Sequence, residues 1–327
     1  MRRIVAVILL LCVLYPLSGC SSRSSYTRKS FFAMDTTVEI KIDPNFEYAK
    51  TVFDNCEKIL KRLEQALSRT IHGNDVWKIN EYTEVAELSN DTVAVIEVAL
   101  SVSELCSGFD ITTASLTDLW QKCANRGTLP TNDEIIIARS AVGYDKLKIS
   151  GNTLKKESEA VKIDLGGIAK GYAADVLVDY LKSAGVQYGI VSFGSCVAVF
   201  GELDNGVAFK IGIKDPSDTS KLIGYVYMTE GVLSVTGDYE RFVEISGEKY
   251  HHVLSPSNGY PVNNGTHSVV VICDNGAIAD ALSTGLFVRG ECEDLYENGD
   301  IDFECIFIGD YGIKMTDGMT NSFELIK

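Results

Sequence analysis

The order in which helical and strand patterns follow one another limits the folds open to this chain. Residues 36–42 alternate apolar and polar side chains as a half-buried strand does, whereas 46–68 carry apolar residues at helical spacing. Two more helices are predicted over 90–108 and 131–142, and the second half consists mainly of β-rich runs. This order is neither a regular βαβ alternation nor all-β. It predicts an α+β fold, with mixed or antiparallel sheets and flanking helices.

The elements predicted in the second half are mostly short. Helical spacing recurs over 168–185 and 277–290. The predicted strands are 161–164, 188–193, 207–213, 241–245, 250–254, 267–273 and 303–309. The last of these strands is expected to close the sheet.

The N-terminus has the features of an export signal. Two arginines precede the apolar run IVAVILLLCVL, and LSGC follows at 17–20, which resembles the lipobox of bacterial lipoproteins. The alternative, a membrane-spanning anchor, would need about 20 apolar residues. We therefore expect 1–19 to be a signal peptide and Cys20 to carry a lipid. Residues 20–30 would form a polar, flexible leash, which predicts an extracytoplasmic protein anchored to the bacterial membrane.

The charge of the chain restricts its partners. Its net charge is -15, from 45 acidic and 30 basic residues. Such a molecule repels polyanions, so nucleic-acid binding is not expected. A phosphate-containing ligand would need a metal ion or a few local cations to neutralise it.

The cysteines do not follow a ligand or crosslink pattern. Seven remain beyond Cys20, without CxxC spacing, which argues against a zinc site and against a disulfide framework. Cys196 and Cys273 lie in apolar runs and are expected to act as small buried hydrophobes.

The stretch DLGGIAKGYAAD, residues 164–175, is a candidate anion site. Glycines at a turn that opens a helix allow backbone N–H groups to approach an anion, and Lys170 adds a charge. The spacing is neither GxxxxGK[ST] nor GxGxxG. The alternative is a packing turn in which Asp164 and Asp175 are only caps or surface charges.

A second candidate is AIADALSTGLF. Asp280 and Thr284 are four residues apart, hence on one face of a helix, and small neighbours leave room for an ion. A carboxylate and a hydroxyl are hard oxygen ligands of the kind Mg²⁺ takes. The alternative is a buried aspartate that bonds to a threonine.

A third candidate covers residues 236–262, where a turn at Thr236 and Gly237 precedes Arg241 and paired histidines. In a strand, His251 and His252 would face opposite sides, so only one would serve a given pocket. The alternative is a structural histidine.

Eight blocks, taken in order, resemble the signature blocks of the FAD:protein FMN transferases, the ApbE-like family. The blocks are FFAMDTTVEI, GFDITTASLTDLW, VKIDLGGIAKGYAADVLVDYLKSAG, YGIVSFGS, IGIKDP, TGDYERF, HHVLSPSNGYP and ADALSTGLFVRG. They extend from about residue 31 to about 290. The resemblance therefore predicts one ApbE-like domain over 31–327.

The resemblance also implies roles for particular residues. FAD would be contacted by Met34, Gly108, Phe109, Asp110, Asp164, Lys170 and Val253. Mg²⁺ would be held by the carbonyl of Gly167, by Asp280 and Thr284, and by the carbonyl of Ser283. Arg241, His252 and Asp280 would be the catalytic group, with His252 a candidate proton shuttle because of its usual pKa.

The chain departs from the family pattern at several positions. Ser255 stands where the family usually has Asp, and Thr70 stands where many members have a flavin-stacking Tyr. MDT also replaces MGT, and VTG replaces TSG.

The implied reaction is Mg-dependent transfer of FMN from FAD to a Thr or Ser hydroxyl of an acceptor protein, with release of AMP. One alternative is hydrolysis of FAD to FMN and AMP. Another is a lipoprotein that binds FAD without turnover.

Overall fold

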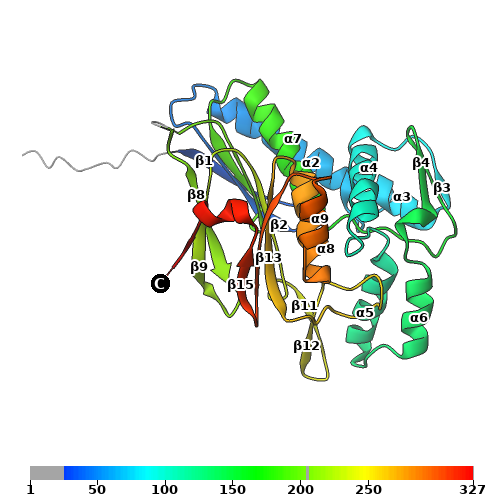
Figure 1. The fold of residues 1–327 in the computed structure, drawn as a ribbon. Coiled ribbons are helices and arrows are strands. Elements are labelled where there is room, and N and C mark those ends of the chain that lie inside the picture. The colour runs from blue at the N-terminus through cyan, green and yellow to red at the C-terminus, as the bar shows by residue number, and fades with distance from the viewer. Residues whose placement is uncertain (1–25, 204–205, 327) are drawn as a thin grey trace, which may run out of the picture.

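An eight-stranded antiparallel sheet forms the centre of the computed structural model, which describes residues 26–203 and 206–326 (Figure 1). Its strand order is β1-β2-β6-β7-β10-β13-β14-β15. The strands are β1 (Thr27–Ala33), β2 (Thr36–Ile42), β6 (Gly189–Ser192), β7 (Cys196–Phe200), β10 (Gly231–Gly237), β13 (Thr266–Cys273), β14 (Glu304–Gly309) and β15 (Gly312–Met315). Helices and antiparallel strands thus occur together as the sequence predicted for the α+β class.

Helices and three smaller sheets surround this sheet. The helices are α2 (Ala49–Leu67), α3 (Asp75–Glu81), α4 (Asn90–Leu105), α5 (Ala114–Arg126), α6 (Asn132–Ser140), α7 (Ala169–Ser183), α8 (Gly276–Arg289) and α9 (Glu293–Asn298). The smaller sheets contain β3 (Glu84–Val85), β4 (Leu147–Ser150), β5 (Thr153–Lys156), then β8 (Phe209–Asp215), β9 (Asp218–Met228), β16 (Phe323–Leu325), and finally β11 (Phe242–Ile245) and β12 (Glu248–His251). Within the described ranges, no helix is both long and apolar enough to span a membrane.

The main sheet is buried on both faces. In β13, Val269 and Val271 join the core beneath α7 and α8, whereas Val270 points into a second core. That second core includes Phe209 of β8 and Val226 of β9. Figure 1 shows β8 and β9 on the side of the sheet away from α8. Successive side chains of a strand point to opposite faces of the sheet, so the apolar residues of β13 enter both cores.

Helices α7 and α8 cross with their backbones in contact. A Cβ atom built on Gly171 would lie 1.9 Å from the carbonyl oxygen of Gly276, so only glycine fits at this position. Asp175 of α7 accepts hydrogen bonds from the backbone N–H groups of Gly276, at 2.8 Å, and Ala277, at 3.0 Å. It therefore caps α8, and burial raises the pKa of this carboxyl to about 6.

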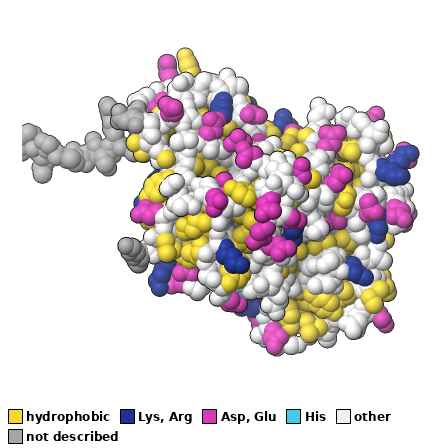
Figure 2. Space-filling model, in the orientation of Figure 1, with side chains coloured by type: hydrophobic (Ala, Val, Ile, Leu, Met, Phe, Trp, Pro, Cys, Tyr) yellow, Lys and Arg dark blue, Asp and Glu magenta, His cyan; other side chains and the backbone are white. Residues whose placement is uncertain are grey.

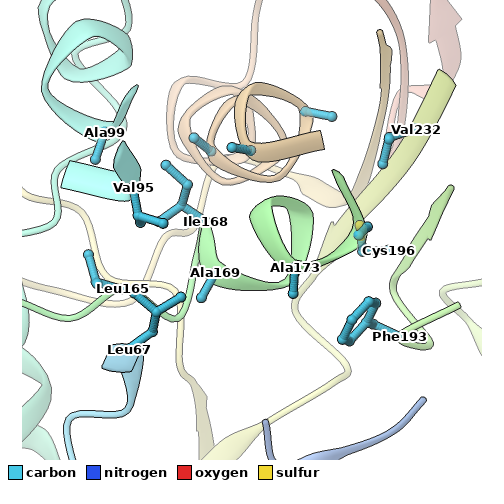
Figure 3. Close-up of a cluster of buried hydrophobic side chains, with 14 of the residues drawn as sticks. Leu67, Val95, Ala99, Leu165, Ile168, Ala169, Ala173, Phe193, Cys196 and Val232 are labelled. Carbon is cyan, nitrogen blue, oxygen red and sulfur yellow. The ribbon is translucent and has the colours of Figure 1, made fainter. Parts of the chain in front are cut away.

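Apolar side chains fix the glycine turn before α7. Figure 3 shows Leu165 beside Leu67 of α2 and Ile168 directed toward Val95 of α4. All four side chains are buried in the main core. Leu165 and Ile168 thus anchor the turn against helices α2 and α4.

Several segments differ from the sequence prediction: helix α5 was not predicted, and the predicted strand 250–254 ends at His251. Residues 161–164 do not form a strand, because only Lys162 makes an isolated bridge, to Thr113. Thr236 and Gly237 end strand β10 and do not form a turn. Strand β10 was missed because nearly all of its side chains are buried, which removes the alternation that marks a half-buried strand.

Candidate functional site

A cavity of about 1000 Å³ opens between the sheet, the glycine turn and the β11–β12 hairpin. This volume is at the upper end of the range for small-molecule sites, large enough for a dinucleotide. The predicted residues on its wall are Met34, Gly108, Phe109, Asp110, Asp164, Gly167, Lys170, Arg241, His252, Val253, Asp280 and Thr284. Ser283 is fully buried behind the wall, and Cys20 lies outside the described residues.

Met34 reaches the cavity from the tight turn between β1 and β2. Met34 and Asp35 have φ angles of 55° and 59°, in a left-handed region that favours glycine. The backbone N–H of Met34 donates to Oε1 of Glu64 on α2 at 2.8 Å. This strained turn is therefore held in place at the cavity wall.

The segment that carries Gly108, Phe109 and Asp110 packs directly on α8. A Cβ on Gly108 would lie 2.1 Å from the carbonyl oxygen of Gly285. The Asp110 carboxylate accepts from Thr112 N at 2.7 Å and from Tyr144 N at 2.9 Å. Burial raises the pKa of Asp110. The carboxylate therefore orders the loop, and the Asp110 carbonyl accepts from Thr113 Oγ1 at 3.1 Å.

Arg69 is a cavity residue that sequence reasoning missed. Its guanidinium pairs with Oδ2 of Asp164 at 3.0 Å and also bonds to Asp118. The second Asp164 oxygen accepts from the backbone of Gly166 at 2.9 Å. Arg69 directly precedes Thr70, the position where many family members have a flavin-stacking Tyr. This neighbourhood was the one sequence feature that could have indicated Arg69 as a site residue.

Asp280 is the buried carboxylate of the site, only 3% exposed. Its Oδ1 accepts from Ser234 Oγ at 2.9 Å, and its Oδ2 accepts from the backbone N–H of Gly171 at 3.0 Å. Lys170 Nζ lies 3.9 Å from Oδ2 and donates to the carbonyl of Gly166 at 3.2 Å. The glycine turn and the Asp280 helix therefore meet as one polar cluster.

The oxygen groups next to Asp280 suit a hard cation. A Cβ on Gly167 would lie 3.2 Å from Thr284 Oγ1, so the glycine leaves the hydroxyl open to the turn. Ser283 Oγ donates to the Asp280 carbonyl at 2.9 Å and is 2.8 Å from Thr236 Oγ1. The described part of the chain contains no cluster of three or more His, Cys, Asp or Glu side chains placed for a metal. One carboxylate, one hydroxyl and a carbonyl fit Mg²⁺ only if phosphate and water supply its other ligands.

Both histidines lie along the cavity, contrary to the expectation that only one would. Strand β12 ends at His251, so the alternation of sides does not extend to His252. His251 Nε2 bonds to the Val262 carbonyl at 2.7 Å, which gives this residue a structural role.

His252 differs from a typical proton shuttle. Its Nδ1 is 3.1 Å from the carbonyl of Arg241. Although the ring faces the open cavity, desolvation by the surrounding walls lowers the pKa of His252 to about 4, and the Arg241 cation adds to the effect. The imidazole is therefore neutral at neutral pH, so the usual histidine pKa no longer supports the shuttle role.

Two of the departures from the family pattern, Thr70 and Ser255, lie in different places. Thr70 is on the cavity wall, where its hydroxyl is 3.0 Å from Ser68 Oγ. Ser255 is 7% exposed and bonds to Ser257 Oγ at 2.9 Å. Of these two, only Thr70 is placed to contact a ligand directly, and the other departures, at Asp35, Val235 and Thr236, also line the cavity.

The fold is that of the flavin transferases, as comparison with solved structures shows. The solved structure of the ApbE protein of Thermotoga maritima matches with a TM-score of 0.83 and 30% identity, over 91% of this chain and 99% of that one. The flavin transferase ApbE of Vibrio cholerae matches with a TM-score of 0.76 and 28% identity, over 89% of this chain and 97% of that one.

Sequence comparisons agree with the structural ones. The FAD:protein FMN transferase of Vibrio cholerae serotype O1 is 31% identical over 283 residues, 84% of this chain and 85% of the relative. That of Haemophilus influenzae is 26% identical over 308 residues, 89% of this chain and 88% of the relative. The sequence profile of the ApbE family matches residues 34–307. The chain belongs to the ApbE family.

Proposed function

We propose that this chain transfers FMN from FAD to a threonine or serine hydroxyl of an acceptor protein, releases AMP, and uses Mg²⁺ as a bound ion. The observation that carries the proposal is the cluster of Asp280, Lys170, Thr284 and the glycine turn on the wall of a dinucleotide-sized cavity. The names of the relatives supply the substrate class.

The reaction is a phosphoryl transfer. The acceptor hydroxyl oxygen bonds to the FMN-side phosphorus of FAD as the bond from that phosphorus to the bridging oxygen breaks. AMP leaves with the bridging oxygen, and the hydroxyl proton passes to solvent or to AMP. Mg²⁺, when bound, would supply positive charge at the diphosphate.

The residues of the chain position the substrate for this step. Lys170 would pair with a phosphate oxygen, because its Nζ lines the cavity and its protein contacts, the Gly166 carbonyl at 3.2 Å and Asp280 at 3.9 Å, leave it a further donor. Asp280, Thr284 and the Gly167 carbonyl would hold the ion. Arg69 fixes Asp164, which limits how far the turn can move.

The first prediction tests the role of Asp280. Asp280→Asn keeps the size of the side chain but removes the charge that would hold Mg²⁺, so AMP release and acceptor labelling should be lost. The measurement incubates the protein with FAD, Mg²⁺ and a candidate acceptor, then follows flavin fluorescence of the acceptor band and free AMP. EDTA should stop the wild-type reaction, and added Mg²⁺ should restore it.

The matched control is Asp274→Asn, an exposed aspartate just before α8 that is not on the cavity wall. This variant should keep wild-type transfer. Full activity of Asp280→Asn, or no effect of EDTA, would show that the cluster is ordinary core. AMP and free FMN without acceptor labelling would instead indicate FAD hydrolysis, and FAD binding without AMP would indicate storage.

A further inference from the structure

Two cysteines that do not line the cavity lie with their sulfur atoms in contact. Cys292 stands between α8 and α9, and Cys305 is the second residue of β14. Their Sγ atoms are 3.4 Å apart. Cys305 is fully buried and Cys292 is half-buried, so solvent reaches the pair from the Cys292 side only.

The protein holds both partners in position. Cys305 pairs with Val271 in the main sheet, and its backbone N–H donates to Thr316 Oγ1 at 2.9 Å. On the Cys292 side, the backbone N–H of Tyr296 in α9 donates to the Cys292 carbonyl at 2.9 Å, and the Tyr296 ring packs edge-on against Phe303, with 5.9 Å between centroids. The sulfurs of a disulfide are about 2.05 Å apart, so an approach of roughly 1.4 Å would close the pair.

The two thiols differ in acidity in the way that a redox pair requires. The hydrogen bond from Cys305 lowers the pKa of Cys292, and nearby Arg289 lowers it further, against the opposing effects of burial and of Glu293 and Asp294. The same contact with Cys292, together with burial, raises the pKa of Cys305. The accessible thiol is thus the one that forms the nucleophilic thiolate more readily.

We propose that Cys292 and Cys305 are a redox modification site that closes to a disulfide with an external disulfide oxidant. The Cys292 thiolate attacks one sulfur of the oxidant and releases its first thiol. The Cys305 sulfur, on losing its proton, then attacks Cys292 and displaces the second thiol. Two protein thiols are oxidised, and one external disulfide is reduced to two thiols. The resulting disulfide would covalently link the segment after α8 to strand β14.

The test uses the full chain with oxidised glutathione as the probe. The reduced, folded protein is incubated with the probe, quenched with acid, and analysed by intact mass, by thiol titration after denaturation, and by non-reducing peptide mapping. We expect a loss of two hydrogen atoms, two fewer thiols, and a single peptide that links Cys292 to Cys305.

Variants separate this pair from the other cysteines. Cys305→Ser should stop at a mixed disulfide of glutathione on Cys292, and Cys292→Ser should form neither product. The matched control, Cys123→Ser in α5, should still form the crosslink. Retention of both thiols in the wild-type protein under the oxidant would overturn the proposal, as would a crosslink between other cysteines. The wild-type result decides the matter even where Cys305→Ser does not fold.

Discussion

Asp280 is held at the site by groups from separate parts of the chain. Ser234 comes from a strand 46 residues earlier, and the Gly171 amide comes from another helix, 109 residues earlier. Each carboxylate oxygen has one protein donor and keeps a lone pair for a further partner. A buried aspartate in this state is oriented, yet it still has the capacity to bind a cation.

The second prediction concerns Lys170. Lys170→Met removes a charge whose side chain is 21% exposed on the cavity wall and should weaken FAD binding by about 1–3 kcal/mol, roughly 5- to 150-fold in Kd. Calorimetric titration with FAD measures the change. Lys148→Met, on the exposed face of β4, is the control and should bind as the wild type does. An unchanged Kd for Lys170→Met would assign this lysine a structural role.

The third prediction concerns the pH dependence of His252. Its folded-state pKa, about 4, lies below the ordinary value of 6.5, so the folded state favours the neutral ring. The resulting contribution to stability is complete above pH 6.5 and is lost as the pH falls toward 4. Titration of the histidine ring signals by NMR should show His252 neutral down to about pH 5. His267, between Asp238 and Asp310, should show the opposite shift, because these carboxylates raise its pKa. A His252 pKa near the ordinary value of 6.5 would contradict the prediction that the surrounding walls lower it.

At the scale of elements, the crossing of α7 and α8 determines the geometry of the site. The fourth prediction is that Gly171→Ala destabilises the fold, because the new methyl group would overlap the Gly276 carbonyl and press on Asp280. Overpacking of this kind costs about 1–3 kcal/mol. Urea unfolding measures it. Lys182→Ala, at the exposed end of the same helix, should stay within about 0.5 kcal/mol of the wild type. Equal stability of the two variants would show that the crossing can relax.

The elements that the sequence predicted well are those with a local periodic signal. Helices α2 and α7 were predicted as 46–68 and 168–185 and are observed as Ala49–Leu67 and Ala169–Ser183. Strand β10 was not predicted, because a strand buried on both faces has no alternation. The segment 161–164 was predicted to be a strand, but it makes only an isolated bridge and has no partner strand to complete a ladder.

Site contacts between residues close in the sequence could likewise be predicted, whereas contacts between residues far apart in the sequence could not. Asp280 and Thr284 could be paired from the sequence because four residues make one helical turn. Arg69 and Asp164 are 95 residues apart, and no local pattern announces such a contact. The pKa of His252 could not be foreseen either, because it depends on walls assembled from several segments.

At the scale of the whole molecule, the net negative charge of the protein opposes the negative charge of the proposed ligand, FAD. Figure 2 shows acidic side chains widely spread over the visible face, and the net charge is -15. The cavity wall includes the cations Arg69, Lys170, Lys214 and Arg241 alongside six acidic residues: Asp35, Glu64, Asp110, Asp164, Glu240 and Asp280. A dianionic ligand would thus find local cations inside a molecule whose long-range field repels polyanions.

The fifth prediction concerns location and is a proposal about residues outside the described ranges. If Cys20 carries a lipid, Cys20→Ala should release the protein from membranes or leave it as an unprocessed precursor. Fractionation of expressing cells, with immunoblotting for chain length, measures the outcome. Cys12→Ala, in the predicted signal peptide, is the control and should remain processed and membrane-bound. A shortened Cys20→Ala chain that stays on the membrane would contradict the lipobox.

The contact between Gly171 and Gly276 has a consequence for how this protein can diverge over evolutionary time. The position of Asp280 depends on an amide N–H and on two helices that touch without side chains. Substitutions elsewhere on these helices can change the shape of the cavity and the ligands it admits, while the carboxylate stays where it is. The carboxylate that we propose as a metal ligand therefore depends most on Gly171 and Gly276, and substitution of either glycine would displace it first.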